Sequence, residues 1–529
     1  MALLGVVGAV VFIVVASSLG GDVPAASAGV PSLPVGLASR APTATAGEES
    51  AGPAATPASV AGVAIVPVVG FRRPWTSTDA AEIAAIVAGT SSRYAAIEVV
   101  GELAGPTLAR IGVDGPPPVA NVIEAASPAA VIRDVRAHAD RLGFVPADLV
   151  EPSVRALGWE EVSLFGVSRV SSLDAWALIA DASQAVPAGA GYDPAKAWTL
   201  VAGGDLNLDG QVAYHVKQLG LGVDFPFDGG TATITGHTCC SFAGQPLPTG
   251  NRTGNRGAVR ELLSRADLSI ANFENPAPDT FDYHPAGFTF SADPALIEGV
   301  ANAGIDWVSL ANNHIGDYGD AGILDTLQNL DRWGIAHGGA EANLPAAREA
   351  TLLDAGGITV GILGYDTIKP GYAAGADSPG SNQLSADRVA ADIQAAREAG
   401  AQLVVVVPHW GTEYTAATTV GQQRLAHAAV DAGADLVIGA HSHWAGGVEA
   451  YRGVPIFYSL GDFVFNISRS EQTMEGIVLE LTFSGTRLVQ VRILPHLILD
   501  KSQPNLLDPA GSGSVVMKQV FGASPAFPW

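Results

Sequence analysis

Short apolar runs alternate with segments of helical periodicity from residue 197 onward. Strands are expected at 199–202, 268–271, 307–310, 359–363, 403–407, 436–438 and 456–460, with further β-rich runs at 477–483 and 488–493. Such alternation is typical of βα units arranged around a mixed, layered sheet. In sheets of this kind, ligands bind beyond the carboxyl ends of the strands. The predicted fold class is therefore α/β, and a binding site is expected at those strand ends.

A smaller α/β domain is expected upstream, over residues 60–196. Strands are predicted at 63–69, 96–100 and 162–167. A helix is predicted to begin near Ser77 and to end at Gly89, because apolar residues recur on one helical face between them. The stretch 144–157 is weakly similar to part of a periplasmic solute-binding lobe. A purely structural domain is the alternative interpretation.

The first 59 residues differ in composition from the rest of the chain. An uncharged apolar run covers residues 2–16, and a candidate cleavage site follows at 26–28. This pattern predicts a signal peptide or a membrane anchor over 1–28, although the usual positive charges are missing. Residues 29–59 are rich in Ala, Pro and Thr and predict a linker. Either interpretation of 1–28 makes the protein extracytoplasmic. At the other end, 501–529 is expected to be a tail.

The charge balance excludes one class of partner. The chain has 529 residues, with 28 Lys and Arg against 52 Asp and Glu, for a net charge of −24. No basic surface is available to neutralise a phosphate backbone, so we expect no nucleic-acid partner. The only cysteines, Cys239 and Cys240, are adjacent in the chain. They form either a vicinal disulfide or two loop thiols, and we assign them no catalytic role.

Carboxylate, amide and imidazole side chains follow five of the predicted strands. They occur in the segments Gly204-Asp205, Asn272-Phe273-Glu274-Asn275, Asn312-Asn313-His314, His409-Trp410-Gly411 and His441-Ser442-His443. Side chains at the ends of neighbouring strands point into one crevice, so these groups are expected to meet. Their nitrogen and oxygen ligands, without sulfur, suit Zn, Mn or Fe. The sequence therefore predicts a site for two divalent metal ions.

The same segments carry a resemblance to a known family. Residues 199–465 resemble the CapA family of poly-γ-glutamate capsule biosynthesis proteins, within the calcineurin-like metallophosphoesterases. The matching motifs are GGDLNLDG, ADLSIANFENP, WVSLANNHIGDYGDAGILDTL, VVVVPHWGTEY, GAHSHW and PIFYSLGDFVFN. The resemblance implies a layered α/β/β/α sandwich over 197–500 that contains two divalent ions.

The resemblance also implies a function in capsule biosynthesis. One interpretation is a two-metal hydrolytic site acting on a phosphoester or on an anionic capsule polymer. The alternative is a non-catalytic subunit that anchors or exports the polymer and contains a structural metal site. In both cases the implied partners include membrane-associated capsule assembly proteins.

Site residues are implied by the same resemblance. One ion would be bound by Asp205 and His443, and Glu274 would bridge to the second. The ligands of the second ion would be Asn313, His409 and His441. His314 would act as a general acid or would stabilise the transition state, and Asp317 would orient it.

Asn207 departs from the superfamily pattern, which begins Asp-x-His. An amide is a poorer transition-metal ligand than an imidazole, so Asn207 and Asn275 are expected either as weak ligands or as supporting residues. A calcium loop is the rival interpretation of Asp205, Asn207 and Asp209. It lacks the required Glu at position twelve, which is Val216.

Three aromatic residues lie beside the expected ligands in the sequence. They are Trp410, Tyr414 and Trp444. Aromatic side chains can form the wall of a substrate site, and simple packing is the alternative.

Overall fold

The computed structural model describes residues 62–113, 119–181, 191–284 and 287–524. The expected signal peptide or anchor at 1–28 and the linker at 29–59 lie outside these residues. Within the described ranges, no helix is both long and apolar enough to cross a membrane.

A six-stranded sheet occupies residues 62–181, in the order β4-β3-β5-β1-β6 with β8 also paired to β1. Its strands are β1 (Gly62–Gly70), β3 (Ala96–Val100), β4 (Val122–Ala125), β5 (Arg141–Pro146), β6 (Val154–Ala156) and β8 (Ile179–Asp181). Its helices are α1 (Ala80–Val87), α2 (Ala104–Arg110) and α3 (Pro128–Ala137). The side chains of β1 from Ala64 to Val69 are all buried. This sheet therefore has a hydrophobic core of its own.

Two local expectations in this region are wrong. Helix α1 begins after Asp79 rather than near Ser77, because the Asp79 side chain accepts a hydrogen bond from the Glu82 N–H. Residues 162–167 do not form a strand. Glu161 and Gly166, with φ of 68° and 83°, turn the chain near both ends of that segment.

A ten-stranded sheet forms the centre of the C-terminal region, in the order β11-β10-β26-β25-β24-β9-β12-β13-β14 with β23 also paired to β9. Its strands are β9 (Ala197–Leu206), β10 (Thr231–Thr238), β11 (Leu247–Gly254), β12 (Leu268–Phe273), β13 (Trp307–Ser309), β14 (Ala336–Gly338), β23 (Asp462–Val464), β24 (Glu475–Ser484), β25 (Arg487–Leu499) and β26 (Gln503–Leu507). The strands β9, β12, β13 and β14 are mutually parallel.

A second six-stranded sheet has the order β16-β17-β19-β20-β22-β21. Its strands are β16 (Thr351–Ala355), β17 (Ile358–Asp366), β19 (Leu403–His409), β20 (Leu436–Ile438), β21 (Val448–Tyr451) and β22 (Val454–Phe457). Shorter elements are β2 (Ser77–Thr78) paired with β7 (Gly158–Trp159), β15 (Ala340–Glu341) paired with β18 (Gly380–Ser381), and helices α4 (Gly210–Ala213) and α8 (Leu344–Ala347).

The two large sheets share a hydrophobic core between them. Leu200 of β9 packs in this core with Val405 of β19. The next residue in β9, Val201, belongs instead to the core that includes helices α5 (Ala258–Ser264), α6 (Ile297–Asn302) and α7 (Gly319–Trp333). Val404 of β19 belongs likewise to the core formed with α9 (Ala386–Glu398) and α10 (Val420–Asp431).

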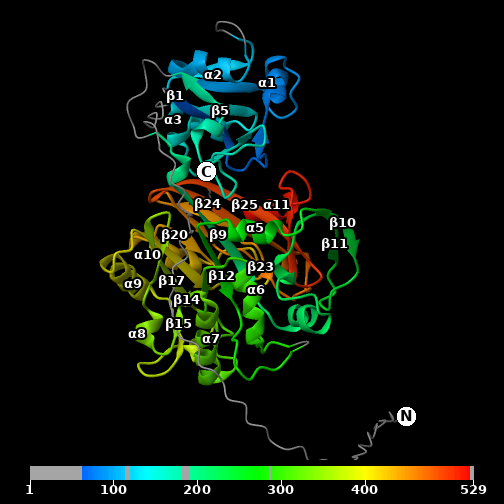
Figure 1. The fold of residues 1–529 in the computed structure, drawn as a ribbon, viewed down its shortest axis with the longest axis vertical. Helices are drawn as coiled ribbons and strands as arrows, with labels where there is room; N and C mark the ends of the chain where they lie inside the picture. Colours follow the sequence, from blue (N-terminus) through cyan, green and yellow to red (C-terminus); the bar gives the residue numbers. More distant parts are fainter. Residues whose placement is uncertain (1–61, 114–118, 182–190, 285–286, 525–529) are drawn as a thin grey trace, which may run out of the picture. The chain divides into compact units, whose positions relative to one another are not determined.

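This alternation follows from strand geometry, because successive side chains of a strand point to opposite faces of the sheet. One face of each sheet is covered by the other sheet, and the opposite face by helices (Figure 1). The predicted α/β/β/α sandwich is confirmed.

Residues 501–524 of the segment expected as a C-terminal tail are part of the fold. β26 pairs with β25 and β10, and helix α11 (Ser514–Ala523) buries Val516 and Val520 completely. The expectation failed because β26 reads Gln-Pro-Asn-Leu-Leu, a run too polar to be recognised as a strand.

The first prediction concerns the core between the sheets. Leu481 of β24 is fully buried there, so Leu481→Ala is expected to lower the free energy of unfolding by about 2–5 kcal/mol. Leu219→Ala is the matched control, because Leu219 is 51 % exposed and its loss is expected to change stability by only about 0.5 kcal/mol. Denaturant unfolding of the full chain measures both. Equal losses would show that the core between the sheets has been assigned wrongly.

Candidate metal centre

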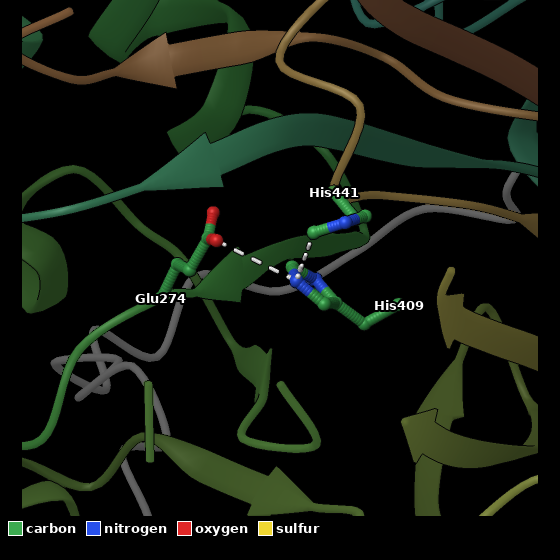
Figure 2. A group of neighbouring side chains, drawn as sticks. All are labelled: Glu274, His409 and His441. Atoms are coloured by element: carbon green, nitrogen blue, oxygen red, sulfur yellow. Dashed lines mark hydrogen bonds and ion pairs between the residues drawn. The ribbon is translucent and has the colours of Figure 1, made fainter. Parts of the chain in front are cut away.

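Glu274, His409 and His441 form a first group of buried side chains at the carboxyl ends of strands. Glu274 directly follows β12, His409 is the last residue of β19, and His441 comes three residues after β20. His409 Nε2 lies 3.5 Å from Glu274 Oε1 and 3.1 Å from His441 Nδ1 (Figure 2). Two imidazole nitrogens and a carboxylate thus converge within the reach of a single ion.

Asp205, His443 and Asp462 form a second group of the same kind. His443 Nδ1 lies 2.8 Å from Asp462 Oδ1 and 4.0 Å from Asp205 Oδ2. The two aspartates are brought together because β23 runs parallel to β9 with Asp462 opposite Asp205. All three side chains are buried.

The two groups are neighbours. The His441 N–H donates a hydrogen bond of 3.2 Å to Asp205 Oδ2. The Asn272 side-chain amide donates to Asp205 Oδ1 at 2.8 Å and lies 3.2 Å from His409 Nδ1. Asn313 Oδ1 lies 2.7 Å from His409 Nε2. The structure therefore brings together all six of the expected metal-binding residues.

The chemistry of the donor set fits divalent cations. Glu274 is fully buried, and neither of its carboxylate oxygens accepts a hydrogen bond from the described residues. Asp462 Oδ2 is also buried without a hydrogen-bond partner in that part of the chain. An ionised carboxylate that is removed from water without partners is strongly destabilising unless a cation compensates it. These oxygens, together with imidazole nitrogens, are the ligands that transition metals take in proteins.

Burial and the clustered charges shift the pKa values of the site in opposite directions. Burial, helped by the Glu274 carboxylate, raises the pKa of Asp205. Burial, helped by the charge of His409, lowers the pKa of His441 to about 2, which leaves a neutral imidazole. For His443, burial is outweighed by the carboxylates of Asp462 and Glu274, which raise its pKa to about 10. A proton on His443 and a metal ion therefore compete for the same buried carboxylates.

The backbone at two of these histidines is strained. His441 and His443 have φ of 97° and 55°, in the left-handed region that residues other than glycine rarely adopt. Strain of this kind, at about 1–3 kcal/mol per residue, persists only where the surroundings enforce it. The turn from His441 to His443 directs two imidazoles from one short segment into the two groups.

Asp462 was missed by the analysis of the sequence. A signal was present, because Gly461-Asp462-Phe463 repeats the pattern of Gly204-Asp205-Leu206 after another apolar run. The repeat has a structural counterpart, since these two segments pair as β23 and β9.

His314 and Asp317 lie just before helix α7 and form a hydrogen-bonded pair. His314 Nδ1 is 2.8 Å from Asp317 Oδ2. The Tyr372 hydroxyl donates to Asp317 Oδ1 at 3.1 Å, and the Phe290 N–H donates to Asp317 Oδ2 at 3.0 Å. His314 directly follows Asn313, whose Oδ1 lies 2.7 Å from His409 Nε2, so the pair adjoins the first group.

Asn207 and Asn275 are engaged with the backbone. Asn207 donates a hydrogen bond from its side chain to the Glu274 carbonyl and accepts one from the Asp209 N–H. Asn275 accepts from the Leu208 N–H and donates to the Pro276 carbonyl. These two amides brace the segments that carry Asp205 and Glu274.

The carboxylate of Asp209 is also occupied by protein donors. One oxygen accepts hydrogen bonds from the Gly210 and His284 N–H groups, and the other accepts from the Ser291 N–H. The oxygens of Asn207 and Asp209 are therefore turned toward backbone donors, unlike the converging ligands that a calcium loop needs.

The three aromatic residues expected near substrate lie in different surroundings. Trp410 is only 1 % exposed, and its indole N–H donates to the Tyr458 carbonyl, so it packs in the core rather than against a substrate. Tyr414 stacks on His443 with 5.6 Å between ring centres and lines a cavity of about 350 Å³. Trp444 is half-buried, and its indole N–H has no hydrogen-bond partner among the residues described.

Known proteins are similar in sequence to this region. The capsule biosynthesis protein CapA of Bacillus anthracis is 33 % identical over 253 residues, which cover 46 % of this chain and 62 % of that protein. The PGA biosynthesis protein CapA of Bacillus subtilis is 33 % identical over 216 residues, covering 39 % and 56 %. The matches thus span less than two thirds of these relatives.

One similar solved structure is the calcineurin-like phosphoesterase YfkN from Bacillus subtilis. It has 13 % sequence identity and a TM-score of 0.32, covering 61 % of this chain and 96 % of that chain. Similarity this distant carries no argument about function, and the fold assignment rests on the layer order described above. The model of the bacterial capsule synthesis protein family PGA_cap matches residues 199–467, just over half of the chain. The chain belongs to this family.

Proposed function

We propose that the metal centre is hydrolytic and cleaves a phosphoester or acyl bond during capsule biosynthesis. The observation that carries the proposal is Glu274, a fully buried carboxylate without a hydrogen-bond donor in the described structure, beside the imidazoles of His409 and His441. Two Mn, Zn or Fe ions would neutralise the three clustered carboxylates. Such ions, when bound, lower the pKa of water and polarise the bond that is broken.

Different residues of the centre would bind the metal ions and transfer the proton. One ion would be bound by Glu274, His409, His441 and Asn313, and the other by Asp205, His443 and Asp462. Glu274 would be shared between the two ions, because neither of its oxygens accepts a hydrogen bond from the described residues and Oε1 is 3.5 Å from His409 Nε2.

His314 is the proton-transfer group in this proposal. Asp317 accepts the hydrogen bond from His314 Nδ1 and fixes the orientation of the ring. Tyr372 and the Phe290 N–H in turn fix Asp317. His314 would donate a proton to the leaving group, or would stabilise the charge that develops on it.

The alternative function is polymer handling with a structural metal site. It is favoured by the names of the CapA relatives, which are described as biosynthesis proteins rather than hydrolases. Under both functions, we propose an anionic capsule polymer and membrane-associated capsule assembly proteins as partners.

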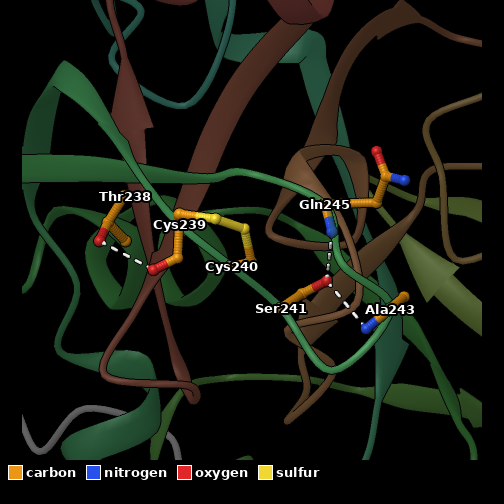
Figure 3. The surroundings of a disulfide bond; sticks show 6 residues. All are labelled: Thr238, Cys239, Cys240, Ser241, Ala243 and Gln245. Atoms are coloured by element: carbon orange, nitrogen blue, oxygen red, sulfur yellow. Dashed lines mark hydrogen bonds between the residues drawn. A yellow bond between two sulfur atoms is a disulfide. The ribbon is translucent and has the colours of Figure 1, made fainter.

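We also propose an extracytoplasmic location. The apolar run at 2–16 supports it, because it is typical of a signal peptide or an anchor. The disulfide between Cys239 and Cys240 supports it independently (Figure 3), because disulfides persist mainly in oxidising compartments.

A prediction about metal content distinguishes ligands from supporting residues. Asp462→Ala is expected to remove about one of two bound ions, because it deletes a ligand. Asn207→Ala is expected to retain the full stoichiometry at saturating metal and to lower stability by about 1–3 kcal/mol, because it breaks two buried hydrogen bonds. Elemental analysis and thermal unfolding of Mn-loaded protein measure both effects. Equal metal loss in the two variants would make Asn207 a ligand.

A further prediction distinguishes a hydrolytic function from polymer handling. His314→Ala is expected to lower kcat on bis(4-nitrophenyl) phosphate by about 10²–10⁴-fold, with metal content and melting temperature nearly unchanged. His427→Ala is the control, because His427 pairs with Glu449 and stacks on Tyr451 outside the centre. Steady-state kinetics and elemental analysis test this. Capsule production that survives His314→Ala but fails in His441→Ala would exclude the hydrolase and leave a structural metal site.

A further inference from the structure

A cavity of about 350 Å³ lies beside the second group of the metal centre. Tyr414 and Phe465 line it, and both rings contact His443, with 5.6 Å and 5.2 Å between ring centres. Phe242 and Phe288 line it as well, and these two side chains are 77 % and 82 % exposed. The cavity therefore has an apolar, open rim, and two of its wall residues contact His443.

Arg469 lies over two of the rings that line this cavity. Its guanidinium carbon is 4.2 Å from the centre of the Tyr414 ring and 5.8 Å from that of Phe242. Contacts of this kind hold the guanidinium plane in place. Lys501 lines the cavity. Among the described residues, neither Arg469 nor Lys501 forms an ion pair with a carboxylate.

The turn that carries Phe242 is braced from within. It connects β10 to β11, and the disulfide between Cys239 and Cys240 lies at its start (Figure 3). The Ser241 hydroxyl accepts hydrogen bonds from the N–H groups of Ala243 and Gln245. Phe242 is therefore presented from a constrained turn.

The turn end of the hairpin formed by β10 and β11 is fixed to the segment that contains Arg469. His237 Nε2 of β10 lies 2.9 Å from Glu471 Oε1, two residues beyond Arg469. The hairpin and the segment are thus connected at two places, through this pair and through the contact of Phe242 with Arg469. Both connections keep the guanidinium against Tyr414 and Phe242, two residues that line the cavity.

We propose that this cavity is an anion-binding subsite in which Arg469 recognises a carboxylate or phosphate group of the substrate. Tyr414 and Phe242 position the guanidinium, so that its N–H donors remain free for a charge-assisted hydrogen bond to the anion. Phe242 and Phe288 cover the apolar part of the same molecule. The subsite rests on the proposed function in one respect only, which is that its ligand is the molecule cleaved at the metal centre.

Calorimetric titration of the full chain with inorganic phosphate and with glutarate tests the subsite. Each anion is titrated into Mn-loaded and into metal-free protein. Arg469→Gln is expected to weaken binding by about tenfold or more in both forms, because it removes a charged donor. Arg469→Lys is expected to restore only part of the affinity, since an ammonium lacks the planar face that stacks on the rings. Arg424→Gln, at an exposed arginine of α10, is the matched control and is expected to bind like the wild type.

The outcomes are decisive in each direction. Tighter binding of phosphate than of glutarate identifies a phosphoester substrate. Tighter binding of glutarate identifies a polycarboxylate substrate. Either result supports the subsite if the binding depends on Arg469. Equal affinity of Arg469→Gln and Arg424→Gln overturns the proposal, as does the absence of saturable binding of both anions to the wild type. Binding that depends on Arg469 in a protein without hydrolytic activity would refute the hydrolase and leave the subsite standing.

Discussion

The structure of the C-terminal region depends on the burial of three carboxylates, those of Asp205, Glu274 and Asp462, at one place. Like charges removed from water repel each other strongly, so the fold needs compensating positive charge there. Imidazoles supplied by the second sheet provide part of it. The oxygens of Glu274, which accept no hydrogen bond from the described residues, mark where further positive charge is needed. The contact between the two sheets therefore supplies both the packing of this region and the charges that its buried carboxylates require.

Local patterns predicted the mixed α/β class and the polar residues at the strand ends, whereas the order of the layers was implied by the family resemblance. Glu274 and His409 come at the ends of apolar runs, and parallel strands carry such residues to one edge. Other features depend on partners that are distant in the sequence. Trp410 is adjacent to a ligand, yet its side chain points to the opposite face and packs in the core. β26 is recognisable as a strand only once β10 and β25 flank it.

The resemblance to a known family made Asn207 a candidate for a weak metal ligand or a supporting residue because of its place in a motif. The hydrogen bonds show the supporting role. Its amide joins the Glu274 carbonyl to the Asp209 N–H and so fixes the spacing between two strand ends. The cavity beside His443 was not foreseen for a different reason. Arg469 and Phe242 have no motif in common, and only the hairpin contact makes them neighbours.

The pairing of Asp462 with Asp205 has a consequence for how the chain matures. β9 begins the C-terminal region and β23 lies near its end, so the second group cannot assemble until the chain between them has folded. Contacts between such distant segments form late, because a long loop must close first. A growing or incomplete chain therefore lacks the assembled group of Asp205, His443 and Asp462. If this group binds an ion as we propose, its binding would report that β9 and β23 have paired.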